Sequence, residues 1–284
     1  MHAIVHPPAR PRAADELLRL ARTAADRIPA AHVAVVVAHP DDETIGCGAL
    51  LARLGGASVI VVTDGAPRNL HDARAHGFAS AQAYAAARSR ELQQALALAA
   101  VPEDRLVCLD IPDQQAAHRL SEITAQLIDV FAARGTTVVL THAYEGGHPD
   151  HDATAFAVHA AARAGARVPA VIEMPYYRGV QNKMVTQRFA ADPDAGELVI
   201  ALDERARALK KRMLEAHATQ QRTLSLFCAE VERFRRAPAY DFRMLPNGGE
   251  LLYEWAGLGL TGAEWLRLAT AALDRFELGQ RTCA

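Results

Sequence analysis

Two short clusters of histidine and acidic residues are the parts of this sequence best suited to chemistry. Residues 39–43 are His-Pro-Asp-Asp-Glu, and residues 148–152 are His-Pro-Asp-His-Asp. Imidazole and carboxylate groups bind zinc and other divalent metals, and members of such a cluster that bind no metal can act as acids or bases. Either cluster alone would also suit a helix cap beside bystander histidines. Together they predict one catalytic metal site with an open coordination position.

Each cluster comes shortly after a predicted strand, which indicates how the fold would bring the two together. Short β-branched apolar runs alternate with longer helical stretches, a pattern typical of an α/β fold. We therefore predict a Rossmann-like, mostly parallel sheet with helices on both faces, and a loop-rich C-terminal segment. Ligands bind at the carboxyl ends of the strands in such sheets, where both clusters would lie. The predicted strands are residues 33–38, 59–63, 106–109, 138–141, 168–172 and 197–202, and the predicted helices are residues 13–27, 45–54, 81–99, 119–133, 153–164, 204–221 and 261–276.

The composition argues against several classes of protein. The formal net charge is −2 and the sequence pI is about 6.6, which is not the footprint of a nucleic-acid-binding protein. No apolar run approaches the roughly 20 residues of a membrane span, and the N-terminus lacks a secretory signal, so we expect a cytoplasmic protein without a membrane partner. The cysteines are far apart, which argues against a thiolate zinc site and a disulfide framework: Cys47, Cys108, Cys228 and Cys283.

No composition shift marks a domain boundary. We predict a single α/β domain over residues 1–284, in which approximately residues 223–284 form an extension that packs on it or caps it. Prolines and glycines between residues 234 and 259 predict that this part is rich in loops. We expect the arginines at positions 233, 235 and 236 to lie on a solvated face.

The order and separation of the two clusters resemble those of the PIG-L/LmbE-type zinc-dependent N-deacetylases. The resemblance extends over approximately residues 33–221. Members of that family deacetylate N-acetylglucosaminyl conjugates, precursors in thiol biosynthesis and glycosylated antibiotics. The resemblance implies a metal-dependent amide hydrolase, an N-deacetylase that acts on an N-acetylglucosamine-type sugar conjugate or a related small N-acyl metabolite.

The resemblance also implies a role for individual residues of the two clusters. The metal ligands would be His39, Asp42 and His151. Asp41 would be the general base that takes a proton from the attacking water. His148, in its protonated form, would stabilise the oxyanion, and Asp150 would hold the ring of His148 in the required tautomer.

Weaker similarities lie between the clusters. Arg88 resembles an arginine of the family that reaches substrate hydroxyls, and Asp113 occupies a position similar to an acceptor of sugar hydroxyls. Arg88 with Glu91 would also suit an ordinary surface pair, and Asp113 a turn. In both cases the two interpretations stay open.

Amide hydrolysis gives this ligand set a physical rationale. Zinc lowers the pKa of bound water to about 7 and so supplies a nucleophile at neutral pH. We expect Zn2+ as the cofactor, with Fe2+ as the alternative. The expected partner is a small N-acyl substrate, and Trp255 and Trp265 would form either a sugar platform or part of the core. A homo-oligomer is an open alternative to a monomer, because oligomers are common among relatives.

The sequence departs from the family pattern in one place near the second cluster. Some relatives carry a tyrosine two residues before its first histidine, where this chain has Gly146. Tyr144 would be the substitute. His217 faintly resembles part of a late family motif, but a histidine on a helix surface is the expectation there. Six further histidines outside the clusters are expected to have no role: His32, His71, His76, His118, His142 and His159.

Three other functions fit parts of this pattern. A dinucleotide-binding oxidoreductase would use Gly46 and Gly48, but Leu51 stands at the third glycine position and the preceding loop is acidic. An iron oxygenase could use the same type of ligand set. A non-catalytic metal-binding protein on the same fold is the third candidate, and a hydrolase of a different amide, such as a thiol or antibiotic conjugate, is a variant of the main hypothesis.

Overall fold

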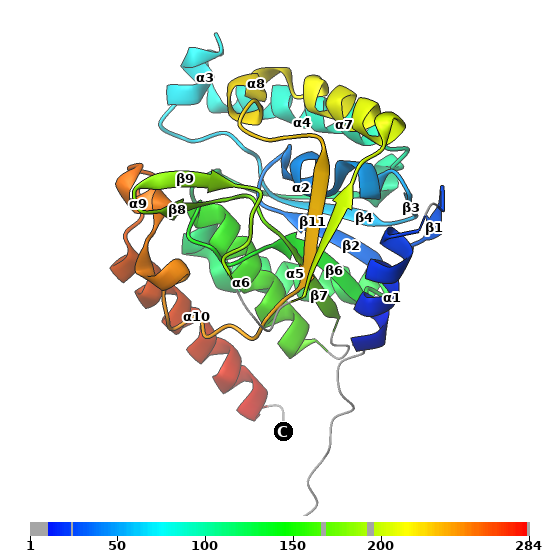
Figure 1. Cartoon of the computed structure of the whole chain (residues 1–284). Helices are drawn as coiled ribbons and strands as arrows, with labels where there is room; N and C mark the ends of the chain where they lie inside the picture. The colour runs from blue at the N-terminus through cyan, green and yellow to red at the C-terminus, as the bar shows by residue number, and fades with distance from the viewer. Residues whose placement is uncertain (1–10, 24, 166–168, 192–195, 283–284) are drawn as a thin grey trace, which may run out of the picture.

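A seven-stranded sheet forms the centre of the protein (Figure 1). The computed structural model describes residues 11–23, 25–165, 169–191 and 196–282. The strand order is β10-β11-β7-β6-β2-β4-β5. The five strands from β7 to β5 are parallel to one another, and β11 pairs antiparallel with both β7 and β10. The bounds are β2 Val33–Val37, β4 Ser58–Thr63, β5 Leu106–Ile111, β6 Val138–His142, β7 Ala170–Met174, β10 Glu197–Ala201 and β11 Val231–Arg236.

Helices cover both faces of the sheet, as the strand–helix alternation predicts (Figure 1). On one face, the core contains side chains of α1 (Pro11–Ala21), α2 (Asp42–Leu51), α4 (Ala81–Leu98) and α7 (Glu204–Ala216). On the other face it contains side chains of α5 (Leu120–Arg134), α6 (Pro149–Ala164) and α10 (Gly262–Thr282). The predicted mostly parallel α/β sheet with helices on both faces is confirmed.

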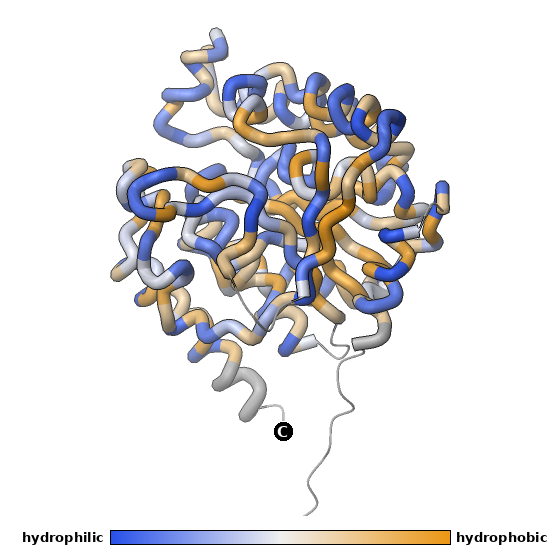
Figure 2. The backbone as a smooth tube through the Cα atoms, viewed as in Figure 1, coloured by the Kyte–Doolittle hydropathy of each residue, from blue (hydrophilic) through white to orange (hydrophobic). Residues whose placement is uncertain are grey.

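The strands in the middle of the sheet are apolar on both faces. All five residues of β2 and all six of β4 are buried, because helices pack on either side of them. Figure 2 shows these hydrophobic strands enclosed by more polar helices and loops. The predicted strand at residues 168–172 corresponds to β7, and residue 168 lies outside the described residues.

The short elements complete the chain. Two of them form the antiparallel hairpin β8–β9, which the sequence patterns did not predict. The remaining bounds are β1 Ile28–Pro29, β3 Leu54–Gly55, β8 Tyr177–Val180, β9 Lys183–Thr186, α3 His71–Ala75, α8 Gln221–Leu224, α9 Leu252–Trp255, η1 Glu103–Arg105, η2 Ala116–Arg119, η3 Ala218–Gln220 and η4 Asn247–Gly249.

The arginine-rich segment is a strand of the sheet, and its expected solvation is wrong for one residue. Arg235 is 6% exposed, and its Nε donates to the Glu173 carboxylate at 2.9 Å. β11 also pairs with both β10 and β7, so part of the C-terminal segment lies inside the sheet. Within the described ranges, none of the helices combines the length and apolarity that crossing a bilayer requires.

Candidate metal centre and active site

Three side chains from the two clusters meet at the carboxyl ends of β2 and β6. The Asp42 Oδ2 atom lies 3.3 Å from Nδ1 of His39 and 3.4 Å from Nε2 of His151, and the two imidazole nitrogens are 3.3 Å apart. His39 and Asp42 come from the turn after β2, whereas His151 comes from the first turn of α6. The structure thus brings together all three residues that were predicted to bind the metal.

The size of this triangle fits a zinc ion. Zinc binds imidazole nitrogen and carboxylate oxygen at about 2.0–2.2 Å with tetrahedral geometry, so neighbouring ligand atoms lie about 3.3–3.6 Å apart. The three observed separations of 3.3, 3.4 and 3.3 Å match one face of such a tetrahedron. All three residues are buried, which holds the donor atoms in place.

The second nitrogen of the His39 ring is held by two carboxylates. Its Nε2 lies 3.4 Å from an oxygen of Asp113 and 3.4 Å from an oxygen of Asp150. A carboxylate on the far nitrogen orients a metal-binding histidine and increases its basicity. Burial alone would lower the pKa of His39, but the neighbouring carboxylates outweigh burial and raise it well above the ordinary value.

Neighbouring histidines keep the carboxyl group of Asp42 ionised. Burial opposes ionisation of Asp42, but His151 and His142 outweigh it and hold the pKa of the Asp42 carboxyl well below its usual range. The Asp42 carboxylate is therefore ionised at neutral pH, as a metal ligand must be.

Asp41, next to the metal-ligand candidate Asp42, is paired with a buried arginine. Its carboxylate accepts a hydrogen bond of 2.9 Å from Nη2 of Arg88. Its backbone has a φ of 148°, a region that non-glycine residues rarely adopt, and its N–H donates to the Glu43 carboxylate at 3.1 Å. Burial raises the pKa of Asp41 to about 7, although Arg88 opposes the shift. A carboxylate of this pKa suits a general base near neutral pH.

The two terminal nitrogens of Arg88 are engaged within the protein. Nη1 donates to the Gly65 carbonyl at 2.5 Å, and Nη2 donates to the Pro40 carbonyl at 3.0 Å besides its bond to Asp41. The Arg88 Nη1 atom also lies 4.0 Å from Asp113. Arg88 therefore binds Asp41 and the Pro40 carbonyl and fixes the turn after β2. Asp113 lies against His39.

His148 lies edge-on to His39, with ring centroids 4.6 Å apart. Its Nδ1 accepts a hydrogen bond from the backbone N–H of Asp150 at 3.1 Å, which leaves Nε2 to carry the proton of the neutral ring. Burial and the nearby rings of His39 and His151 lower the pKa of His148 well below its usual value. The expected protonated His148 is thus replaced by a neutral ring that can still donate from Nε2.

The Asp150 carboxylate does not hold His148, in contrast to the sequence-based expectation. It accepts backbone N–H bonds from Gln114 at 2.6 Å and Ala116 at 3.0 Å, and it also faces His39. Asp150 occupies the first turn of α6, so its side chain turns away from the His148 ring while its backbone contacts that ring. Asp150 and Asp113 therefore both contact His39, a candidate metal ligand.

Two buried histidines belong to the site although sequence reasoning set them aside. His142 ends β6 and stacks on the His151 ring at 4.1 Å, and its Nε2 accepts the Ala38 N–H at 2.8 Å. His217 is fully buried, and its Nε2 lies 3.4 Å from the Glu43 carboxylate. The expected surface position of His217 is wrong, because the end of α7 folds over the first cluster. The one signal for His142 was its position at the end of a predicted strand.

The comparisons with known proteins agree with this arrangement. A family model described as PIG-L, GlcNAc-PI de-N-acetylase, matches residues 34–162, which include both clusters. The chain carries a PIG-L family domain. A comparison with curated proteins found no match.

Several solved structures share the fold of this chain. The A40926 pseudoaglycone deacetylase Dbv21 is 21% identical with a TM-score of 0.57, over 74% of this chain and 99% of that one. A deacetylase in complex with teicoplanin is 19% identical with a TM-score of 0.56, over 72% and 96%. N,N'-diacetylchitobiose deacetylase from Pyrococcus horikoshii is 18% identical with a TM-score of 0.52, over 82% and 95%.

The segment after the PIG-L match packs against the loop that precedes His148. The Leu252 N–H donates to the Gly146 carbonyl at 2.8 Å, and Gly146 has a φ of 72°. The Tyr144 hydroxyl donates to the Met244 carbonyl at 2.9 Å and accepts from the Trp265 indole at 2.6 Å. Tyr144 therefore binds the C-terminal segment and does not replace the family tyrosine at the site.

The two tryptophans have different environments. Trp265 is fully buried in the core, whereas Trp255 is 50% exposed. A side chain at Gly179 would meet the Trp255 indole nitrogen at 3.3 Å, so the hairpin β8–β9 lies against Trp255. Tyr177, two residues earlier on the same strand, contacts the His151 ring with centroids 5.2 Å apart. Residues two apart on a strand share a face, so Tyr177 and Gly179 lie on the same face of β8. This face extends from the triangle of donor atoms to Trp255.

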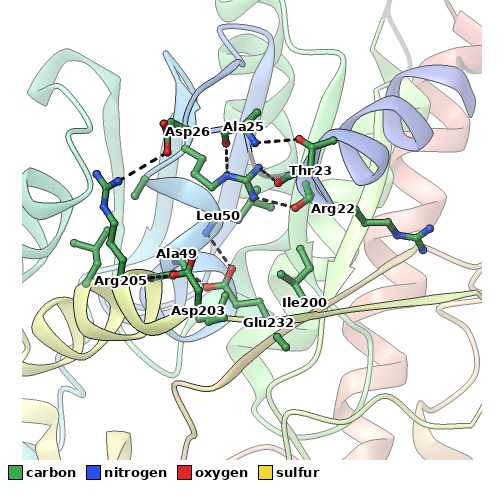
Figure 3. Close-up of a pocket in the computed structure, with 17 residues that line it drawn as sticks. Arg22, Thr23, Ala25, Asp26, Ala49, Leu50, Ile200, Asp203, Arg205 and Glu232 are labelled. Carbon is green, nitrogen blue, oxygen red and sulfur yellow. Dashed lines mark hydrogen bonds and ion pairs between the residues drawn. The ribbon is translucent and has the colours of Figure 1, made fainter.

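A cavity of about 420 Å³ lies away from the predicted site residues (Figure 3). It is enclosed by the end of α1, the end of α2, β10 and the start of α7. Apolar side chains such as Leu50 and Ile200 line it together with the charged residues Asp203, Arg205 and Glu232. This cavity contains none of the metal-ligand candidates.

Proposed function

We propose that this PIG-L protein is a zinc-dependent N-deacetylase that acts on an N-acetylglucosamine-type sugar conjugate or a related small N-acyl metabolite. The observation that carries the proposal is the triangle of donor atoms from His39, Asp42 and His151, whose edges of 3.3–3.4 Å suit tetrahedral zinc. The known deacetylases with the same fold support the type of reaction.

The proposed chemistry begins with the activation of water. A zinc ion held by His39, Asp42 and His151 would supply Lewis-acid activation, which makes hydroxide available near neutral pH. Asp41 takes the proton of the water as its oxygen forms a bond to the acyl carbon. A pKa of about 7 lets Asp41 accept a proton and later return it.

His148 completes the acid–base set. Its Nε2–H donates to the acyl oxygen as negative charge develops there in the tetrahedral intermediate. The carbon–nitrogen bond then breaks, and the proton stored on Asp41 passes to the departing amine, which leaves a free amine and a carboxylic acid that loses its own proton to solvent. The neutral His148 ring suits this donor role, because a single Nε2–H is sufficient.

The part of the substrate beyond the acyl group would lie along the hairpin face between Tyr177 and Trp255. An exposed indole favours the apolar face of a sugar ring, and Trp255 packs directly against the strand at Gly179. One deacetylase with this fold is described in complex with teicoplanin, and another is named for N,N'-diacetylchitobiose. These names support a substrate larger than a monosaccharide.

Alternative functions use the same donor atoms. Iron(II) could replace zinc in a hydrolase, and a hydrolase of another amide would differ only in the substrate region. A non-catalytic metal-binding protein would have no need of the Asp41–Arg88 pair or of a donor at His148. The presence of both favours hydrolysis.

Metal content and acetate release test the proposal together. Elemental analysis of the purified chain is combined with acetate release from a panel of N-acetylglucosamine conjugates, with and without a chelator. We expect about one zinc per chain and release that the chelator abolishes and zinc restores. Metal without any release would favour the binding protein, and no metal after zinc or iron reconstitution would refute the site itself.

A further inference from the structure

Helix α2, which begins at the metal-ligand candidate Asp42, is broken in the middle. Cys47 has a φ of −147° and a ψ of 25°, far from helical values, and the helix resumes after it. In a continuous α-helix the Ile45 carbonyl would accept the N–H of Ala49, and the next carbonyl that of Leu50. The break removes these bonds, so the freed groups need other partners in a buried environment.

Two side chains from outside the PIG-L match supply those partners. Glu232 on β11 accepts the Ala49 N–H at 2.8 Å and the Leu50 N–H at 3.0 Å, and Figure 3 shows its carboxylate next to both. Lys210 on α7 donates to the Ile45 carbonyl at 2.8 Å. Lys210 and Glu232 also bind each other at 3.0 Å, and they are 0% and 2% exposed.

The charges of this pair match the ends of the two half-helices. Glu232 lies at the start of the second half, where free N–H groups attract an anion. Lys210 lies at the end of the first half, where free carbonyls attract a cation. The pair therefore takes the place of the missing helical bonds with the polarity that the break requires.

The first half of α2 is held by side chains at other carbonyls as well. The Tyr176 hydroxyl donates to the Asp42 carbonyl at 2.9 Å. A side chain at Gly46 would come within 2.5 Å of that hydroxyl, so the close approach requires glycine there. Tyr176 therefore holds the first turn of α2 together with Lys210, which holds the Ile45 carbonyl.

We infer that the buried Lys210–Glu232 pair is a positioning device that keeps α2 broken and so places the Asp42 carboxylate for metal binding. The inference rests on the proposed zinc site. If α2 were continuous, residues 42–45 would be collinear with the second half of the helix. The Asp42 carboxylate would then change its position relative to His151. Lys210 and Glu232 are positioning residues, because neither contacts the triangle of donor atoms.

The test replaces both members of the pair and measures the metal site directly. The double variant Lys210→Met with Glu232→Met removes both charges and allows the helix to become continuous. We expect its zinc dissociation constant, from chelator competition at 10 °C, to rise at least tenfold. We also expect the Ala49 and Leu50 amides to form helical hydrogen bonds in the double variant, and its crystal structure to show a continuous α2 with a shifted Asp42. A helix that stays broken at Cys47 without the pair would overturn the inference.

A second buried ion pair provides the matched control. Arg235 and Glu173 bind at 2.9 Å, are similarly buried and join β11 to β7. The variant Arg235→Met with Glu173→Met should lower Tm as well, yet change the zinc dissociation constant less than twofold. If the first double variant does not fold, Glu232→Gln, which retains one acceptor oxygen, should weaken zinc binding about threefold or more.

The results separate this inference from the proposed function. Zinc binding within twofold of wild type in the Lys210 and Glu232 variants would overturn the inference and leave the deacetylase proposal intact. An equal loss of affinity in both double variants would overturn it too, because general destabilisation would then explain the effect. A wild-type chain that binds no zinc would overturn both.

Discussion

The guanidinium of Arg88 lies 2.9 Å from the carboxylate of Asp41, and both side chains are buried. The sequence resemblance implied that Arg88 would reach the substrate, whereas the structure pairs it with the proposed general base. An adjacent cation stabilises the ionised carboxylate, so Arg88 opposes the effect of burial on the pKa of Asp41. This relationship makes the pH dependence of the reaction a test of both roles.

Replacing Arg88 should shift the acidic limb of the pH–rate profile. The base must be ionised to act, so kcat/KM should rise with pH through the pKa of Asp41, about 7. In Arg88→Met the pKa of Asp41 should rise further, which moves the limb to higher pH and lowers the rate at neutral pH. Profiles of kcat/KM from pH 5 to 9 provide the measurement. Arg88→Lys, which retains the charge, should shift the limb less, and an unchanged profile in Arg88→Met would contradict the pairing.

Asp41 and His151 should differ in what their loss removes. Asp41→Asn should keep zinc and lose turnover by about 10²- to 10⁴-fold, because only proton transfer is lost. His151→Ala should lose zinc and activity together, because one corner of the donor triangle is gone. Zinc content and acetate release, measured on the same preparations, make the comparison. Loss of zinc in Asp41→Asn would mean that the base and ligand roles are exchanged.

Trp255 should affect large substrates and not small ones. Trp255→Ala should raise KM for N-acetylglucosamine conjugates by about two- to tenfold, the effect of losing about 0.5–1.5 kcal/mol of aromatic contact, and leave kcat unchanged. KM for a minimal N-acetyl substrate should stay the same. Trp255→Phe should recover most of the loss, and Val199→Ala, at an exposed site on β10, serves as the control. An equal change for both substrates would refute a contact with the larger part of the conjugate.

His159 should make the protein sensitive to acid. Burial, aided by Arg163, lowers the pKa of His159 to about 4 in the folded state, against about 6.5 when unfolded. Between these values the unfolded chain binds the additional proton, so stability falls as pH drops from about 6.5 to about 4. At pH 5 this loss is about 2 kcal/mol.

His159→Gln should remove that part of the acid sensitivity. Urea unfolding at pH 7 and pH 5 measures the difference, and the variant should lose about 2 kcal/mol less than wild type between the two. The side chain of His159 is 15% exposed, so solvent screening is limited. Equal losses in the two proteins would show that His159 does not stay neutral on folding.

Local sequence determined the fold class and much of the turn that carries His39 and Asp42. Continuous apolar runs such as those of β2 and β4 predict strands that are covered on both faces, because the pattern of apolar residues is a property of a short stretch of chain. The His39 N–H bonds the Asp42 carboxylate at 2.8 Å across three residues, so this contact also is local. The residue types and spacing of the two clusters predict a single metal site, and the family resemblance implies which of their residues bind the metal.

The tertiary structure decided which distant residues meet. His39 and His151 are 112 residues apart in the chain, and Arg88 is 47 residues from Asp41. The insertion of β11 between β10 and β7 brings Glu232 to the break in α2, a contact that spans more than 180 residues. Residue periodicity records whether a side chain is buried but not which partner it meets, because the partner depends on the order in which the strands and helices pack.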